Sequence, residues 1–247
     1  MRSVVILFFY GMYSILYSCE KAPITDAFKP TGPITIEQRT LNATIHTVSI
    51  YSNINLTTVA DSTNYIVLTA GKNLLPKITT QLVADELIIK NTNTFNWTRS
   101  YSTPINVVLH TNNLAYLKVL GTGTITINKN TYNTDTLKIR GDLTSSEVNI
   151  YCTSKVMVLD ISTGTGTYIL HGKCDRLFAY TGAIGRIDAS DFKSNYTDFT
   201  NSGLSDIYLN TQGDIYGQIY SLGNVYDKGI GNLRYLNNPD RGNYIKQ

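Results

Sequence analysis

The chain has 247 residues, enough for one large domain or two small ones, and its formal net charge is +3. Charged residues are only 16% of it, against about a quarter in typical soluble domains, and threonine, asparagine, serine, tyrosine and glycine take their place. No stretch gathers lysine and arginine into a basic patch, so the composition argues against nucleic acid as a partner.

Residues 1–18 have the pattern of a targeting segment. Arg2 precedes the apolar run VVILFFYGMYSILY, which ends directly before Ser18 and Cys19. As a helix, these fourteen residues would span about 21 Å. A bilayer core is roughly 30 Å thick, so the run fits the hydrophobic region of a signal peptide better than a transmembrane helix.

The sequence Leu16-Tyr17-Ser18-Cys19 resembles a bacterial lipobox, in which an aliphatic residue and a small residue precede the cysteine. The resemblance implies a lipoprotein signal peptide over 1–18, cleavage before Cys19 and lipidation of Cys19. Tyr17 is larger than the residue usual at its position, and an ordinary secretory leader is the alternative. We expect a membrane attachment through this N-terminal lipid anchor, in the cell envelope, as an outer membrane lipoprotein exposed to the periplasm or the cell surface.

Residues 19–33 contain three prolines and no apolar periodicity, which predicts a flexible tether. A single β-domain is expected to follow over 34–247, because no linker-like change of composition divides it.

The first part of this domain, 34–113, alternates like β-strands but repeats irregularly. The segment 72–83 allows a helical turn that Pro76 limits. We expect wider loops and antiparallel pairs here, capping one end of the β-structure. The candidate strands are 34–38, 44–51, 64–70, 86–90 and 105–110.

The stretch 114–226 repeats about every twenty residues, which is typical of a solenoid. Within each unit the apolar residues alternate with a period of two, as in strands. The pattern predicts a right-handed parallel β-solenoid, about one rung per repeat, with capped ends; 227–247, which lose the period, are expected to form the C-terminal cap. One apolar column comprises Leu117, Leu137, Val156, Leu177, Tyr196 and Ile215.

The repeat also predicts which side chains face the core and where the rungs turn. We expect the glycines to occupy corners that need a positive φ or a close backbone approach, with positive φ at Gly141. The glycine column comprises Gly121, Gly141, Gly164, Gly182, Gly203 and Gly223. The predicted inward set is Leu117, Val119, Leu137, Ile139, Val156, Val158 and Leu177.

Few residues suggest catalysis or metal binding. His46, His110 and His171 are scattered and have no cysteine nearby in metal-ligand spacing, so we expect no metal site, no cofactor and no catalytic residue. Cys152 and Cys174 are 22 residues apart, which leaves open a disulfide between rungs or, as we favour, two separate small apolar side chains.

The second half of the chain contains two further groups of residues with functional side chains, one acidic and one of tyrosines. The acidic residues are interpreted as turn and solvent-facing positions, and the tyrosines either as strand packing or as a face for sugar or protein contacts. The acidic group is Asp188, Asp191, Asp198, Asp206 and Asp214. The tyrosines are Tyr196, Tyr208, Tyr216, Tyr220, Tyr226, Tyr235 and Tyr244.

Several phrases occur together in an order that resembles one protein family. They are GKNLLPKI (71–78), LVADELIIKN (82–91), NWTRSY (96–101), PINVVL (104–109), LAYLKVLGTG (114–123) and GNLRYLNNP (231–239). The chain resembles the head GIN domain family, labelled "putative autotransporter adhesin", whose members are secreted proteins and lipoproteins of Gram-negative envelopes. The resemblance implies a β-helix-like fold, an envelope location and an adhesion or binding role, and supplies no catalytic motif.

These observations lead to one functional hypothesis and two rivals. We expect a lipid-anchored, non-enzymatic binding or adhesion module of the cell envelope, whose partner is a glycan or protein on the cell surface. The alternatives are a carbohydrate-active β-helix enzyme (a polysaccharide lyase or hydrolase) and a structural or assembly component of the envelope. Acidic residues aligned across rungs would favour the enzyme, and a tyrosine-lined face would favour glycan binding.

Overall fold

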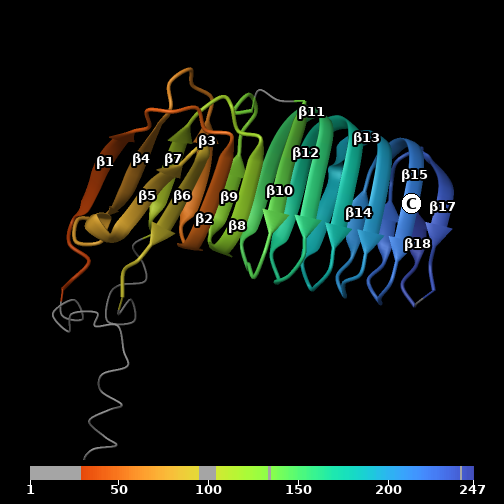
Figure 1. Cartoon of the computed structure of the whole chain (residues 1–247). Helices are drawn as coiled ribbons and strands as arrows, with labels where there is room; N and C mark the ends of the chain where they lie inside the picture. The colour runs from red at the N-terminus through yellow and green to blue at the C-terminus, as the bar shows by residue number, and fades with distance from the viewer. Residues whose placement is uncertain (1–28, 95–103, 133–134, 240) are drawn as a thin grey trace, which may run out of the picture.

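Alternating apolar and polar residues dominate the chain, and most of the described structure is β-strand. The computed structural model describes residues 29–94, 104–132, 135–239 and 241–247. The strands wind into an elongated β-solenoid with β1 at one end and β17 at the other (Figure 1), which confirms the expected fold class. In the part of the chain described, no helix is long and apolar enough to cross a membrane. The expected signal peptide and Cys19 lie outside the described residues.

Pairing between rungs arranges the regular part as two parallel sheets, called sheet I and sheet II below. Sheet I contains β8 (Tyr116–Thr122), β10 (Thr136–Gly141), β15 (Thr211–Ile219) and β17 (Asn232–Asn237). Sheet II contains β9 (Thr124–Ile127), β14 (Ile207–Leu209), β16 (Val225–Asp227) and β18 (Tyr244–Lys246).

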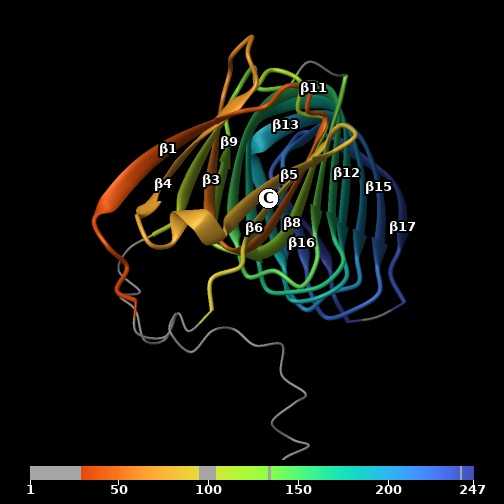
Figure 2. The same cartoon turned by 60° about the vertical axis from the view of Figure 1, so that its left-hand side comes forward.

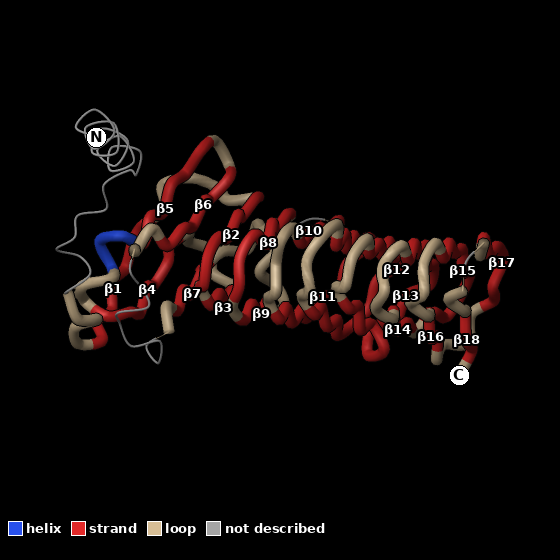
Figure 3. Tube along the Cα trace, turned by 90° about the horizontal axis from the view of Figure 1, so that it is seen from below, coloured by secondary structure: helices blue, strands red, loops and turns tan. Residues whose placement is uncertain are grey.

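Three long strands bend and connect the two sheets. They are β11 (Glu147–Ile161), β12 (Thr167–Thr181) and β13 (Arg186–Asn201). Their first halves pair within sheet II, and their second halves pair within sheet I. Seen from below, the strands and their connecting turns therefore repeat along the length of the solenoid (Figure 3).

The register between rungs fixes the inward columns of side chains. Leu137 lies opposite Met157, and Met157 lies opposite Leu177, so the repeat in this region is 20 residues. Of the expected inward set, Leu117, Val119, Leu137, Ile139 and Leu177 are fully buried, as predicted.

The prediction was wrong for Val156 and Val158, which point outward and are only half-buried. Met157 and Leu159 occupy the inward positions instead, and Thr197 rather than Tyr196 faces the core in β13. The physical reason is that 156–159 is an unbroken apolar run, and such a run does not indicate which of its residues face inward. A slip of one residue exchanges the two faces of a strand.

The glycine column is explained mainly by close approach between rungs. Gly164 alone in this column has a left-handed backbone, with φ +104°, and a Cβ there would lie 2.2 Å from the Thr144 carbonyl oxygen. The expected positive φ at Gly141 was wrong. Gly141 ends strand β10, and a Cβ on it would lie 1.9 Å from the hydroxyl oxygen of buried Tyr168. Glycine is needed there because the tyrosine side chain fills the space.

The N-terminal part contains the antiparallel pairs that the irregular pattern predicted. Strand β4 (Tyr65–Gly71) is antiparallel to both β1 (Ile34–Thr40) and β7 (Asn106–His110), and β5 (Ile78–Val83) is antiparallel to β6 (Glu86–Asn91). The short 3-10 helix η2 (Leu75–Lys77) contains Pro76 and supplies the expected helical turn. Figure 2, in which this end comes forward, shows β1 and β4 at its edge.

The first rung of the chain is inserted between two later ones. Strand β2 (Thr47–Asn53) pairs with β6 on one side and β8 on the other, and β3 (Asn55–Val59) lies between β7 and β9. In Figure 1 the orange strands β2 and β3 therefore separate later, yellow and green strands. The chain winds outward through β4 and β5 and then returns, so order in sequence and order in space differ here.

The stretch 227–247, for which we expected a cap, continues both ladders. Strand β17 pairs in parallel with β15, and β18 pairs with β16. The fully buried Asp227 carboxylate joins these rungs. It accepts hydrogen bonds from the Thr211 N–H (2.9 Å), the Tyr244 hydroxyl (3.0 Å) and the Lys246 ammonium (3.0 Å).

Candidate functional site

The residues singled out for thiol or histidine chemistry do not form a site. Cys152 and Cys174 are both buried free thiols, and burial raises the pKa of Cys174 to about 12, so its reactive thiolate is disfavoured. His46 lies 3.3 Å from Asp85, and His171 stacks on Tyr151, so each has a separate local partner. Within the described ranges, no three His, Cys, Asp or Glu side chains are placed to hold a metal ion.

The acidic residues of the second half are dispersed rather than gathered. Asp191 pairs with Lys228 at 3.1 Å, Asp214 pairs with Arg234 at 2.6 Å, and Asp206 accepts a hydrogen bond from the Asn224 backbone. Asp188 pairs with Arg186 on the sheet II half of β13, whereas Asp198 lies on the sheet I half. The acidic run therefore does not form one catalytic cluster.

The expectation of turn positions was wrong for Asp188, Asp191, Asp198 and Asp214, which lie within β13 and β15. Asp198 differs from the other acidic residues in having no hydrogen bond or ion pair to the described residues. It lies in the middle of the second half of β13 and is half-buried. Its neighbours at the same level are Phe178 on β12 and Tyr216 on β15. Burial raises the pKa of the Asp198 carboxyl above its ordinary value, because desolvation disfavours the charged form.

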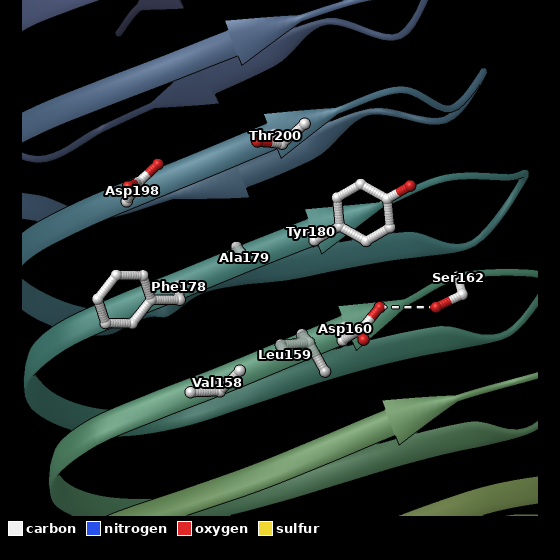
Figure 4. Close-up of a pocket in the computed structure, with 9 residues that line it drawn as sticks. All are labelled: Val158, Leu159, Asp160, Ser162, Phe178, Ala179, Tyr180, Asp198 and Thr200. Carbon is white, nitrogen blue, oxygen red and sulfur yellow. Dashed lines mark hydrogen bonds between the residues drawn. The ribbon is translucent and has the colours of Figure 1, made fainter.

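An open groove crosses the outer side of sheet I beside this carboxyl group. Its volume is about 440 Å³, and it runs over the second halves of β11, β12 and β13 (Figure 4). Outward positions on neighbouring parallel strands supply most of the lining, because alternate residues of each strand face the same side, and the inward-facing Leu159 and Ala179 also contribute to it. The lining residues are Val158, Leu159, Asp160, Ser162, Phe178, Ala179, Tyr180, Asp198 and Thr200.

Aromatic rings continue beyond the groove along sheet I. The Phe178 and Tyr196 ring centroids are 6.2 Å apart, and those of Tyr196 and Tyr216 are 5.4 Å apart. The Arg176 guanidinium lies over the Tyr196 ring, with its carbon 5.9 Å from the centroid. Asp198 thus lines the groove on β13 and is level with Phe178 on the neighbouring strand β12 (Figure 4).

The other groove carboxylate, Asp160, is already compensated. The Ser162 hydroxyl donates to it at 2.8 Å, and an Arg140 nitrogen lies 3.9 Å away. Asp160 lies two strands away from β13 and is level with Thr200, two residues beyond Asp198. This offset separates the Cα atoms of Asp160 and Asp198 by about 12 Å. Asp214 is closer to Asp198, but Arg234 holds it at 2.6 Å.

The sequence of the β-domain matches a known protein family. Residues 45–238 match the family model described as "Putative auto-transporter adhesin, head GIN domain". The chain belongs to this family. The curated proteins include no match to it.

Solved structures with the same architecture share little sequence with this head GIN domain. A putative adhesin from Bacteroides fragilis NCTC 9343 is 14% identical, with TM-score 0.79, covering 89% of this chain and 100% of that one. A putative adhesin from Parabacteroides merdae ATCC 43184 is 14% identical, with TM-score 0.62, covering 89% and 98%. A putative lipid binding protein from Parabacteroides distasonis ATCC 8503 is 15% identical, with TM-score 0.51, covering 88% and 99%. At these identities the likeness shows the fold alone.

The tyrosine-rich region of this head GIN domain is divided between its two sheets. Tyr196 and Tyr216 lie outward on sheet I, whereas Tyr208 and Tyr226 stack on sheet II at 5.2 Å between centroids. Tyr244 packs against Phe199 and bonds Asp227, as a structural residue. The phrase NWTRSY (96–101), which contains Trp97, lies outside the described residues.

Sequence reasoning missed Phe178 and Tyr180, the aromatic residues of the groove itself. They precede the last-quarter tyrosines in the chain, and only the register between β12 and β13 brings Phe178 level with Asp198. The available signal was the alternation within each strand. Phe178 and Tyr180 flank the inward Ala179. Asp198 and Thr200 flank the inward Phe199 in the same way, so all four side chains belong to the outer face. Predicting that the two pairs lie side by side required the exact 20-residue offset between β12 and β13.

Proposed function

We propose that this head GIN domain protein is a lipid-anchored, non-enzymatic binding module of the cell envelope, used in adhesion. The family description and the adhesin-like solved structures support the adhesion role. The observation that carries the non-enzymatic part is the groove on sheet I, where one of the two lining carboxyl groups, Asp160, is already paired with Ser162 and Arg140.

The proposed anchor and the solenoid suit presentation away from a membrane. A tether from Cys19 to Pro33, when extended, would reach roughly 50 Å from a bilayer. The solenoid has a continuous buried core from Ile45 to Val225, so it would act as one stiff body at the end of this tether. Its outer faces would then meet surfaces that lie beyond the envelope.

The proposal is tested on cells that carry the full-length protein, compared with a deletion strain and with the complemented strain. We expect attachment to surfaces coated with host-matrix proteins or glycans to fall on deletion and return on complementation. Equal attachment by all three strains would count against adhesion.

The enzymatic alternative is tested on the purified full-length protein with neutral and acidic polysaccharides. We expect no release of reducing ends and no formation of unsaturated products. Turnover that disappears in Asp198→Asn or Asp160→Asn would overturn the non-enzymatic assignment.

A further inference from the structure

The groove on sheet I is selective in the charges and surfaces that it offers. Its nine lining residues include two carboxyl groups, Asp160 and Asp198, and no lysine or arginine. Phosphate, sulfate or uronate groups would therefore meet two carboxyl groups, and the nearby Arg140 already pairs with one of them, Asp160. The lining therefore favours neutral ligands over anionic ones.

The Asp198 carboxylate is a hydrogen-bond acceptor that lacks a fixed donor among the hydrogen bonds and ion pairs of the described residues. Desolvation by neighbouring side chains is the one cause that shifts its pKa. A partly desolvated carboxylate is costly for the fold unless hydrogen bonds compensate it. Two adjacent hydroxyl groups of a ligand would supply donors to its two oxygens, and hydrogen bonds to a charged acceptor are among the stronger ones.

The rings provide the second kind of contact. Tyr180 is 38% exposed and stands at one end of the groove, while Phe178 lies beside the Asp198 position (Figure 4). Flat aromatic surfaces bury apolar C–H groups, and the tyrosine hydroxyl adds a polar contact at the rim. Thr200 and Ser162 add hydroxyl groups, which both donate and accept.

This mixture fits a sugar better than a cation. A sugar ring has an apolar C–H face for Phe178 or Tyr180 and a hydroxyl edge for Asp198 and Thr200. A cation would gain less, because Arg140 already compensates Asp160 at 3.9 Å and Arg176 lies over the Tyr196 ring at the groove's border. The open shape, spanning three strands, also admits a chain that continues past the groove in either direction.

We propose that the groove over β11, β12 and β13 binds a neutral glycan, with Phe178 and Tyr180 stacking on sugar rings and Asp198 accepting hydrogen bonds from adjacent hydroxyl groups. The inference rests on the proposed binding function and names the ligand class and the site. The binding surface would extend along the solenoid, because the aromatic residue Tyr216 lies level with Asp198 on β15, the next strand of sheet I.

The test uses the purified full-length protein in detergent on an array of oligosaccharides. The array carries neutral oligomers of glucose, galactose, mannose and N-acetylglucosamine, their uronate and sulfated counterparts, and lysine-rich peptides. The strongest neutral binder is then titrated by calorimetry against the wild type and three variants, Asp198→Asn, Tyr180→Ala and Tyr151→Ala. Tyr151 is the matched control, because it is 37% exposed and lies on β11 outside the groove.

We expect the protein to bind neutral oligosaccharides, and Asp198→Asn and Tyr180→Ala each to weaken binding by about tenfold or more. Tyr151→Ala should remain within about twofold of the wild type. Thermal unfolding of each variant verifies that the fold is retained, which all three outward positions should permit.

Binding to uronates, sulfated sugars or lysine-rich peptides in place of neutral sugars would overturn the proposal. An equal loss of affinity in Tyr151→Ala and the groove variants would overturn the assigned site. If cells carrying the protein attach in the adhesion assay while the array shows no glycan binding, the glycan inference fails and the adhesion function stands. If both assays are negative, the proposed function fails as well.

Discussion

At the scale of single residues, Asp198 shows a conflict between stability and binding. Its carboxyl group lies level with Phe178 and Tyr216, where desolvation raises its pKa. A raised pKa in the folded state means that ionisation at neutral pH opposes folding. Such a residue is disadvantageous for the fold alone, which agrees with the binding role proposed for it from its place in the groove.

We therefore predict that Asp198→Asn raises the melting temperature at pH 7. The wild-type carboxyl group favours the fold below the ordinary aspartate pKa of 3.8 and loses this contribution as the pH rises through its higher folded pKa. The neutral amide avoids that loss, so the difference between the proteins should shrink as the pH falls toward about 4. Thermal unfolding across pH 4–8 measures it, and a variant less stable than the wild type at pH 7 would contradict the prediction.

The neighbouring residues Val158 and Leu159 test the orientation of β11. Leu159 is fully buried and opposite Ile139, whereas Val158 is half-buried on the groove side. Leu159→Ala should cost about 2–5 kcal/mol of unfolding free energy, because it leaves a cavity. Val158→Ala should cost less than about 1 kcal/mol. Denaturant unfolding compares them, and equal losses would mean that the inward column is misplaced.

At the scale of elements, the turn between β11 and β12 requires glycine at position 164 for two reasons. Its φ is +104°, and a Cβ would lie 2.2 Å from the Thr144 carbonyl oxygen of the adjacent rung. Gly164→Ala should therefore destabilise the protein by about 1–3 kcal/mol or more. Thr165→Ala, at an exposed position in the same turn, is the control and should be nearly neutral. Similar unfolding midpoints for both variants would show that the turn relaxes freely.

The elements also show which features a single sequence reveals. The period of 114–226 predicted stacked strands because each rung repeats the same burial pattern, and five of the seven predicted inward residues are buried. For the run 156–159 the predicted inward residues were wrong, because four consecutive apolar residues do not show which of them alternate toward the core. The insertion of β2 between β6 and β8 was not predictable from periodicity, since it depends on pairing between segments distant in sequence.

The groove illustrates the same limit. Phe178, Asp198 and Tyr216 are unremarkable outward residues along their own strands, and only the parallel register brings them level. The acidic run and the tyrosine-rich quarter were visible in the sequence, yet the bend in β13 separates Asp188 from Asp198. A binding surface on a solenoid is thus a property of columns across rungs rather than of contiguous motifs.

At the scale of the whole molecule, the two ends of the solenoid are built differently. The end near β1 is irregular and contains antiparallel pairs, whereas the end near β17 continues the parallel ladders. Residue 29, where the described structure begins, leads into β1 at the irregular end. A tether attached there would leave sheet I accessible along β11, β12 and β13, because these strands lie in the regular part (Figure 1).

The lipid anchor is the prediction on which this whole arrangement depends. Cys19 is the nucleophile that directly follows the apolar run and a small residue, as lipid transfer followed by cleavage requires. Each buried CH₂ of an acyl chain contributes about 0.8 kcal/mol, and more than one chain makes attachment stable. The native protein should therefore partition with membranes and become labelled by a palmitate analogue. Cys19→Ser should abolish labelling and leave an uncleaved or mislocalised form, whereas Tyr17→Ala, which brings the lipobox closer to its usual pattern, should remain labelled. Normal processing of Cys19→Ser and its release as a soluble protein in wild-type amounts would show that the leader directs secretion without lipidation.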